Sequence, residues 1–482
     1  MLFTFLIPLF KEAKSQSGIS LYHLNNSTFQ GNNFNAAYMP EGKLFLGIPG
    51  ISGIAADVNS PYSYNDAFTT NELGENQLDI DNMVRLANNV NFVAIQAEVS
   101  TLYLGFRPKS TTAFSFFIRE RVSAAGFYTD ETAQFAWEGN GSFAGNELDL
   151  NNTILDARYY REYGLGLWKS IPNKGINFGV RLKFLNGMAS IITDKNFDGT
   201  VQVGQNYDHN FNVNNARLNM SGYNLLTNDS TSSDELTSHL ISNGNLGFGI
   251  DLGAHWKIND QLSASVAIND LGFINWKDDT ENMFLIDTTF YYEGVSQNAS
   301  DFGEAIQDSL FNRFADSTTF ESYRSGLNTS AYGSLLFQLT PDDLITGTIG
   351  THVVQDRFRM LYAIGYTRKV GDILKASANV IRTPQQSIDL GLAVAATFGP
   401  FQMYMASDKV IKIWNVPEAR AFDFRFGINF IFGRTKEVKD DRSDLQHPSI
   451  YGKKERVEKS DGIYWIIKRQ HPRPIYEPPK RE

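Results

Sequence analysis

Apolar and polar residues alternate with a period of two along several segments of this chain. From Ile176 to Phe184 the apolar side chains share one parity, while Asn, Gly, Arg and Lys share the other. The same split runs through 245–256 and through 422–432, where only Ile431 breaks it. Such alternation is typical of a β-strand with one apolar face. A soluble β-sandwich and a membrane β-barrel both have such strands, so the pattern alone does not separate them.

The connections between the predicted strands separate these two architectures. We expect fourteen strands, near 43–57, 91–107, 111–124, 156–170, 175–189, 245–258, 261–275, 328–340, 343–355, 358–370, 372–383, 387–398, 400–408 and 422–432. Short turns between them alternate strictly with longer segments, of which the longest are 58–90, 125–155, 190–244 and 276–327. Tight periplasmic turns and long extracellular loops are typical of outer-membrane barrels. The sequence therefore predicts an all-β, antiparallel transmembrane β-barrel of about fourteen strands, with both chain ends in the periplasm.

Composition agrees with a barrel. The chain has 36 Phe, 21 Tyr and 39 Gly, yet its mean hydropathy is only -0.28. A membrane helix needs a run of roughly 18 or more apolar residues, and we find no such run. In a barrel only alternate residues meet lipid, so no long run is needed. Five aromatic residues near strand ends are expected to form girdles at the membrane interfaces. They are Tyr163, Trp168, Trp256, Tyr362 and Tyr366.

The two ends of the chain differ from its middle. The start, MLFTFLIPLF followed by KEAKSQS, resembles the apolar core and polar end of a secretory signal, without a basic n-region. We expect residues 1–17 to be a signal peptide cut near Ser15–Ser17; an apolar first strand is the alternative. Residues 18–432 would form the barrel. Residues 433–482, with 13 Lys+Arg and 9 Asp+Glu, would form a basic periplasmic tail. Its proline-rich end predicts a flexible segment, and a docking element for a partner is the alternative.

The last predicted strand, FDFRFGINFIF, looks like the closing-strand signal that barrel-assembly machinery reads. Gly427 supplies the glycine, Phe430 a spaced apolar residue, and Phe432 the terminal aromatic. In most such barrels the aromatic residue ends the chain, whereas here the tail follows it. We therefore expect the assembly machinery and the lipid bilayer as partners.

Charged residues on three neighbouring strands share the parity assigned to the lumen. These six candidates are Arg119, Arg121, Arg158, Glu162, Arg181 and Lys183. Charges are costly on a lipid face but tolerated in a wet or paired lumen. They predict a salt-bridged filling with partners from Asp251, Asp423 or Glu98, or else an anion-attracting passage or headgroup site. Glu120 and Arg161 fall on the lipid parity, and we expect them near the outer interface.

No motif in the chain points to catalysis, a metal or a cofactor. There is no cysteine, which excludes disulfides, zinc-thiolate sites and cysteine nucleophiles. We find no GxSxG, HExxH or P-loop motif, and the seven histidines have no ligand spacing. The formal charge of -10 argues against a nucleic-acid surface. We expect neither an enzyme nor a cofactor. Two loop segments, Asp79–Asn88 and Asp301–Ala315, show helical periodicity and could cap or plug the lumen.

Several stretches carry a family resemblance: LFLGIPGISGI, FSFFIRERVSA, GNGSFAG, ARYYREYGLGL and GVRLKFLNGMASI. They resemble a Bacteroidetes-type domain-of-unknown-function family of outer-membrane barrels. That family is similar in architecture to the fatty-acid transporter FadL and to the PorV and PorQ barrels. The resemblance implies a barrel and an outer-membrane address, but no activity.

Two functions follow as hypotheses. The first is a FadL-like channel for hydrophobic or amphipathic small molecules. The second is a PorV-like scaffold or shuttle barrel that binds exported or envelope proteins without transporting them. A soluble periplasmic β protein is the third alternative.

Overall fold

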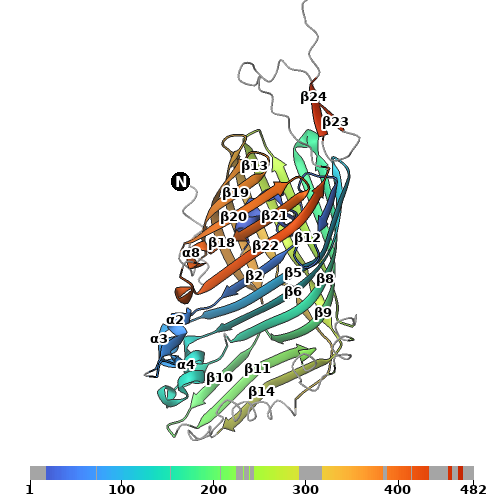
Figure 1. The fold of residues 1–482 in the computed structure, drawn as a ribbon. Coiled ribbons are helices and arrows are strands. Elements are labelled where there is room, and N and C mark those ends of the chain that lie inside the picture. Colours follow the sequence, from blue (N-terminus) through green and yellow to red (C-terminus); the bar gives the residue numbers. More distant parts are fainter. Residues whose placement is uncertain are drawn as a thin grey trace, which may run out of the picture.

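A closed antiparallel barrel of fourteen wall strands dominates the fold (Figure 1). The computed structural model describes residues 18–433 apart from 72, 152, 207, 224–231, 233–237, 239–243, 293–316, 384–387 and 414, together with 454–458 and 465–469. The wall strands, in order, are β1 (Leu44–Gly47) with β2 (Ile54–Asn59), β5 (Asn91–Lys109), β6 (Thr112–Tyr128), β8 (Ile154–Ile171), β9 (Ile176–Thr193), β12 (Leu246–Lys257), β13 (Leu262–Trp276), β15 (Tyr323–Gly326) with β16 (Ser330–Gln338), β17 (Asp343–Val354), β18 (Arg357–Val370), β19 (Leu374–Arg382), β20 (Asp389–Phe398), β21 (Phe401–Ser407) and β22 (Ala421–Phe432). The barrel closes where β22 and β5 pair with opposite edges of β1 and β2. The all-β fold and the fourteen predicted strands are confirmed.

The two ends of the barrel differ in the length of their connections. Short turns join β5 to β6, β8 to β9 through η4 (Pro172–Lys174), and β20 to β21. The opposite end carries α2 (Tyr64–Ala67), α3 (Ile80–Leu86) and α4 (Asp130–Glu138), which gather on one side there (Figure 1). The helix expected within Asp79–Asn88 is confirmed as α3. The one expected within Asp301–Ala315 lies outside the described residues. We call these ends the short-turn end and the long-loop end.

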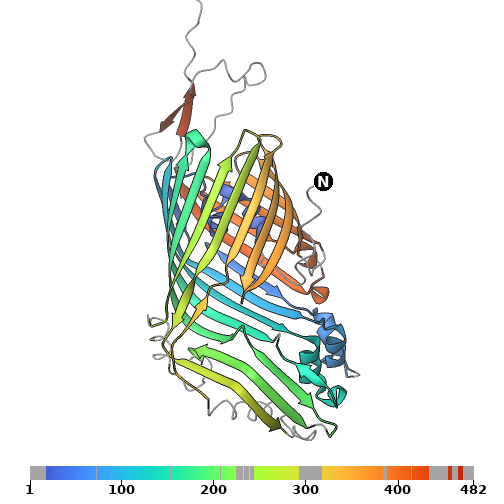
Figure 2. The same ribbon diagram turned by 180° about the vertical axis from the view of Figure 1, so that it is seen from behind.

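Four further strands of the same sheet extend the wall beyond the long-loop end (Figures 1 and 2). They are β7 (Glu147–Asp149), β10 (Asp198–Val203), β11 (His209–Ser221) and β14 (Thr280–Tyr292). β11 pairs with β14 and also with the last residues of β9, so these strands continue the barrel wall. These residues were predicted to lie in loops, and that prediction was wrong. Asparagines interrupt the alternation in β11, apolar residues fall on both parities in β14, and β7 and β10 are short.

Smaller elements complete the described chain. β3 (Phe68–Thr70) and β4 (Asn76–Leu78) form a hairpin in the loop that also carries α2 and α3. In the tail, β23 (Lys454–Glu458) pairs with β24 (Trp465–Arg469). The expected signal peptide, residues 1–17, lies outside the described residues.

The outer face of the barrel is apolar. Alternate residues of the strands are exposed there, including Phe178, Phe184, Leu246 and Leu252. Their polar neighbours Arg181 and Lys183 are buried toward the lumen. This is the parity predicted from the sequence, and an outward apolar band is what a lipid-facing wall requires.

No helix among the described residues is long and apolar enough to cross a bilayer.

Four of the five predicted girdle residues lie on the outer parity. Trp256, Tyr362 and Tyr366 are 50%, 48% and 41% exposed, and Tyr163 is half-buried. Trp168 was assigned to the girdle wrongly, because its side chain is buried and points into the lumen. It shares the parity of Glu162, which the sequence analysis had already placed inside.

The N-terminal segment 18–43 fills part of the lumen, and we call it the plug. It contains α1 (Ile19–His23), η1 (Asn25–Ser27) and η2 (Phe29–Asn33), and appears dark blue inside the barrel (Figures 1 and 2). Most of its residues are buried. The sequence analysis had looked for a plug only in the loops. A short segment without a periodic pattern gave no sign that the barrel would enclose it.

Candidate functional site

Eight charged side chains from six neighbouring strands form one cluster on the inner wall, which we call the lumen cluster. Its members are Glu98 of β5, Arg119 and Arg121 of β6, Glu162 of β8, Arg181 and Lys183 of β9, Asp251 of β12 and Asp270 of β13. Inward parity brings them together because residues of like parity on paired strands face the same side. Each of the eight side chains has an ion-pair partner within the cluster.

Glu162 is at the centre of the lumen cluster and is fully buried. Its carboxylate lies 2.8 Å from Arg119 and 3.4 Å from Arg121. It also lies 3.6 Å from Lys183 and 3.9 Å from Arg181. One carboxylate therefore faces all four cations, which offsets the large desolvation cost of burying them.

The other carboxylates complete the pairing. Lys183 Nζ lies 2.7 Å from Asp251 and 2.6 Å from Asp270, and Asp270 also meets Arg121 at 2.8 Å. Glu98 lies 3.3 Å from Arg119 and from Arg121. Four carboxylates thus face four cations, so the lumen cluster has no net formal charge. This balance favours the salt-bridged filling over the anion-attracting passage.

Asp270 is the member that the sequence analysis missed. The register of β12 against β13 shifts between Ile250 and Leu252, and Asp270 has a positive φ of 60°. Because of this β-bulge, Asn269 and Asp270 are both buried, although they are consecutive residues. A prediction from strict alternation of inward and outward residues is therefore wrong at this point. The backbone N–H of Asp270 donates to Asp251 Oδ1 at 2.7 Å, which holds the bulge.

Two predicted residues lie apart from the lumen cluster. Arg158 points inward but pairs with Asp156 at 2.6 Å and with the carbonyl of Gly326. Asp423, offered as a partner, instead accepts the backbone N–H of Asp408 at 2.9 Å. The expected partners Glu98 and Asp251 do belong to the lumen cluster.

The plug is bonded to the same inner wall. Arg181 donates to the carbonyl of Asn32 at 2.8 Å, and Trp168 donates to the carbonyl of Ala37 at 2.8 Å. At Gly179 the wall approaches the plug so closely that an added Cβ would lie 1.8 Å from the carbonyl oxygen of Ala36. The wall and the plug therefore fit each other through glycine and specific donors.

The wall strand made of β1 and β2 is interrupted by residues 48–53, which we call the wall bulge. Gly47 is opposite Asn429 of β22, and Ile54 is opposite Phe426. The six residues of the wall bulge therefore lie opposite only two residues of β22, Gly427 and Ile428. Gly50 donates to the carbonyl of Ser100 at 3.1 Å, and the carbonyl of Ile51 accepts from Ile428 at 3.0 Å. Pro49 and Ile51 are exposed, whereas Ser52 is buried. The wall bulge therefore protrudes outward while hydrogen bonds hold it to both neighbours.

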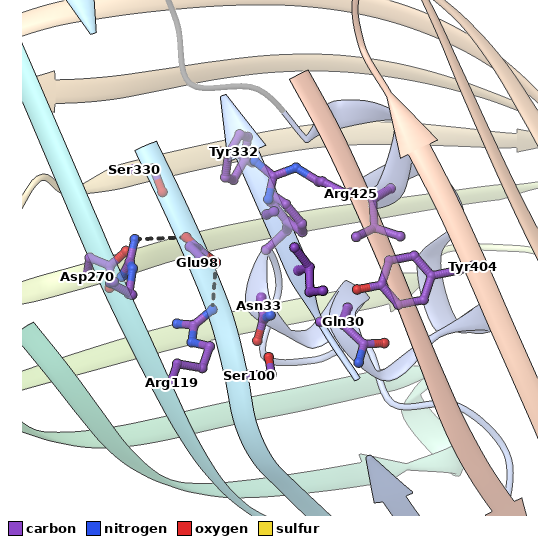
Figure 3. A pocket seen from close by; sticks show the side chains of 16 residues that line it. Gln30, Asn33, Glu98, Ser100, Arg119, Asp270, Ser330, Tyr332, Tyr404 and Arg425 are labelled. Atoms are coloured by element: carbon purple, nitrogen blue, oxygen red, sulfur yellow. Dashed lines mark hydrogen bonds and ion pairs between the residues drawn. The ribbon is translucent and has the colours of Figure 1, made fainter. Parts of the chain in front are cut away.

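A small cavity of about 30 Å3, room for roughly one or two water molecules, lies between the plug, the lumen cluster and the wall beside the bulge. Glu98, Arg119 and Asp270 lie along one side of it, and Tyr332, Tyr404 and Arg425 along another (Figure 3). Gly53, Ile54 and Ala55, at the end of the wall bulge, also belong to its lining. The cavity therefore joins charged and aromatic surfaces to the interrupted strand.

A family model matches residues 37–408, which is most of the chain. The chain belongs to the DUF5723 family, a family of unknown function. This confirms the resemblance to a domain-of-unknown-function family. No curated protein matches this DUF5723 chain.

The solved structures similar to this DUF5723 barrel are outer-membrane-type channels of low identity. A deletion mutant of the monoaromatic hydrocarbon channel TodX is 11% identical, with a TM-score of 0.38, over 86% of this chain and 93% of that one. A FadL homologue of Pseudomonas aeruginosa is 10% identical, with a TM-score of 0.40, over 83% and 93%. The toluene transporter TbuX of Ralstonia pickettii is 9% identical, with a TM-score of 0.37, over 82% and 91%.

An ion pair between Arg161 and Glu120 lies on the outer face of the DUF5723 barrel. Arg161 Nε lies 2.5 Å from Glu120, which also accepts from the hydroxyl of Tyr159 at 3.2 Å. Both charged side chains are about a quarter exposed (25% and 23%). Mutual pairing explains how two charges can occupy the lipid parity.

The three residues of the expected assembly signal lie on β22. Phe430 and Phe432 point outward, and Phe432 is 39% exposed. Gly427 lies against the wall bulge, where an added Cβ would meet the carbonyl oxygen of Ser52 at 2.1 Å. Gly427 therefore has a packing role in the folded barrel. Recognition by assembly machinery stays a prediction.

Proposed function

We propose that this barrel passes a hydrophobic or amphipathic small molecule across the outer membrane. The molecule enters from the long-loop end, passes through the cavity beside the lumen cluster, and leaves sideways through the wall bulge. The cavity itself is only about 30 Å3, so side chains of the wall and the plug must move aside during passage. The short-turn end and the chain that follows β22 face the periplasm, whereas Gly18, at the start of the plug, lies by Asp408 toward the long-loop end. In this arrangement the apolar outer face sits in lipid, and the long-loop end is exposed to the medium.

The plug supports a sideways route over an axial one. Tyr22 bonds with the hydroxyls of Ser265 and Ser334 at 2.9 Å, and His23 bonds with Thr348 at 2.8 Å. On the other side, Gln30 reaches Asn429 at 3.1 Å. These bonds tie the plug to strands around the barrel, so an axial path would require many of them to break together.

The position of the cavity is the observation that carries the proposal. Its lining includes Gly53, Ile54 and Ala55, which continue directly from the wall bulge. Across 48–53 a few backbone hydrogen bonds to β5 and β22 replace the regular ladder, so fewer bonds must break to open the wall there than along a continuous strand. On the outside, Pro49 and Ile51 meet the apolar face of the barrel.

The cavity lining combines aromatic and charged surface. Phe34, Tyr332 and Tyr404 supply the aromatic rings, and five side chains are charged: Glu98, Arg119, Arg121, Asp270 and Arg425. A molecule with an apolar body and a polar end would meet both kinds of surface there. Because the lumen cluster is balanced in charge, the polar end need not be an anion.

Deleting 49–52 tests this route. After the deletion only Ile48 and Gly53 remain between β1 and β2. They can pair with Ile428 and Gly427 of β22, so a continuous strand can form. Uptake of N-phenyl-1-naphthylamine and of radiolabelled octanoate would be measured in cells lacking other routes for each compound. We expect uptake by the wild-type barrel above the vector level, and a fall to the vector level for the deletion.

The matched control is Gly347→Ala, because an added Cβ there meets nothing within 4 Å. Both proteins must show the gel-mobility shift between unheated and boiled samples that reports an intact barrel. If the deletion protein is folded and still takes up the probes, the sideways route is wrong. If the wild-type barrel gives no uptake of either probe, the transport proposal fails.

A scaffold function is the second candidate, and the sheet beyond the long-loop end favours it. β10, β11 and β14 project past the barrel and are not needed to close the wall. If that sheet binds an exported protein, replacing 196–222 by a short loop abolishes a crosslinked complex at the cell surface and leaves probe uptake unchanged. If the replacement abolishes uptake instead, the sheet serves the passage.

A further inference from the structure

Asp408 is a buried carboxylate that holds the first described residues of the plug. Its Oδ2 accepts the backbone N–H of Gly18 at 2.5 Å and that of Ile19 at 2.8 Å, and its Oδ1 accepts the N–H of Ser20 at 2.7 Å. The side chain is only 4% exposed. Since Asp408 directly follows β21, these bonds fix the start of the plug to the long-loop end of that wall strand.

No side-chain cation among the described residues forms an ion pair with this carboxylate. Among the described residues, no Lys, Arg or His nitrogen lies within 4.0 Å of Asp408. A buried carboxylate normally has a charged partner, because its desolvation cost is otherwise uncompensated. Three backbone N–H groups lower that cost but bring no positive charge of their own.

The surroundings of Asp408 contain more negative than positive side chains. Asp423 accepts the N–H of Asp408 at 2.9 Å, and its cross-strand neighbour Asp57 pairs with Lys409 at 3.5 Å. Arg425 lies close to Gly18: a Cβ added to Gly18 would be 2.9 Å from the Nε of Arg425. Three buried carboxylates therefore face two cations. In the part of the chain that the structure describes, no group of three such side chains is arranged to hold a metal ion.

The sequence just before Gly18 supplies an independent observation. Residues 15–17 read Ser-Gln-Ser, and they follow the apolar segment at the start of the chain. Small residues one and three positions before the cut bond are typical of a signal-peptidase site. This pattern places the cut between Ser17 and Gly18, the residue at which the contacts with Asp408 begin.

We propose that the Ser17–Gly18 bond is hydrolysed during export and that the new α-ammonium of Gly18 forms a buried ion pair with Asp408. Water adds across the amide: its oxygen completes a carboxylate on Ser17, and the Gly18 nitrogen gains protons to become an ammonium. The inference requires that the chain be exported, as the proposed function does, but not that the barrel transport anything.

The ammonium would make the local charges equal. It supplies a third cation to Asp57, Asp408 and Asp423, at the position where Gly18 N already lies 2.5 Å from the carboxylate. A charge-assisted bond is roughly twice as strong as a neutral one. Removal of the leader would therefore strengthen the contact that seats the plug.

The structure also explains why a glycine begins the mature chain. A Cβ added to Gly18 would lie 2.4 Å from the ring of Phe34. A residue with a side chain would therefore collide with the plug at this position. The first residue is thus shaped to fit inside the barrel.

The first experiment is the intact mass of the full-length gene product, extracted from the outer membrane. We expect one mass, corresponding to a chain that begins at Gly18. A chain that retains residues 1–17, or begins at another residue, overturns the inference, whereas the transport proposal depends on probe uptake and would survive that result.

The second experiment measures acylation of the α-amine in folded and unfolded protein, read from the N-terminal peptide. Because an ammonium held by a carboxylate gives up its proton less readily, we expect acylation of the folded wild type to be at least about tenfold slower. Asp408→Asn should remove most of that protection. Asp389→Asn is the control, since Asp389 is buried on the neighbouring β20 and has no hydrogen bond to the described plug.

Equal acylation of folded and unfolded wild type would overturn the ion pair. Full protection in folded Asp408→Asn would also overturn it, because burial alone would then explain the protection. If Asp408→Asn fails to fold, the wild-type comparison and the mass still decide.

Discussion

Trp168 of β8 donates its indole N–H to the main-chain carbonyl of Ala37 in the plug, at 2.8 Å. Arg107 lies over the same indole ring, with its guanidinium carbon 4.5 Å from the ring centroid. Arg107 in turn donates to the carbonyl of Pro40 at 2.7 Å. The last part of the plug is thereby bonded to β5 and β8 near the short-turn end, whereas its first residues are bonded to Asp408.

Trp168→Phe is predicted to loosen the plug. Phenylalanine keeps an aromatic ring but leaves the buried carbonyl of Ala37 without its donor, at a cost of about 1–3 kcal/mol. Limited proteolysis of folded barrels should cut the plug sooner, while the wall stays intact. Trp256→Phe is the control, because Trp256 is 50% exposed on the outer face. Equal protease resistance of the two variants would show that the indole N–H does not hold the plug.

Glu162→Gln is predicted to destabilise the barrel strongly. The substitution leaves four buried cations facing three carboxylates, and breaking a buried ion pair in this way costs about 3–5 kcal/mol. The temperature at which the unheated gel mobility is lost should fall. Asp356→Asn, at an ion pair with Lys195 that is largely exposed, should cost only about 0–1 kcal/mol. A similar fall for both would mean that the lumen cluster is screened by water.

Gly427→Ala separates packing from recognition at the closing strand. The new Cβ would lie 2.1 Å from the carbonyl oxygen of Ser52, so the wall bulge must move. We expect a barrel that assembles but unfolds at a lower temperature than wild type, since the clash exists only in the folded state. A protein that is never inserted would instead indicate that the assembly machinery reads Gly427. Gly347→Ala, which meets open space, controls for the loss of a strand glycine.

Phe432→Asp is predicted to impair membrane assembly. Phe432 ends β22 opposite Leu44 and is 39% exposed on the outer face, where a carboxylate is costly in lipid. The amount of heat-shifted protein in membrane fractions measures the effect. Removing residues 440–482 should leave that amount unchanged, because β22 already closes the barrel. Loss of assembly on removal of the tail would contradict the placement of the closing strand.

The wall strands could be predicted because their signal is local. In β9, Phe178 to Phe184 alternates between lipid and lumen, and one residue of shift would put Arg181 on the lipid face. Turn lengths then fixed the number of strands and the two unlike ends. Where a β-bulge interrupts the alternation, as at Asp270, this reasoning failed because the extra residue reverses the parity.

The inward direction of the candidate charges was also a property of the sequence, and so were two of their partners. Parity placed Glu162 and Arg181 in the lumen and offered Glu98 and Asp251, which lie directly opposite Arg121 and Arg181 on neighbouring strands. It could not show that Asp423 would face Asp408 instead. Only the curvature of the closed wall brings Asp270 of β13 to Arg121 of β6.

By itself, the sequence determined that this chain forms a barrel of fourteen strands with an apolar outer face. The physical reason is that lipid and lumen impose opposite preferences on alternate residues of every strand. The tertiary structure decided what fills the barrel. The plug has no periodic pattern, and its seat depends on Asp408, Trp168 and Arg181, which meet it only after the wall has closed.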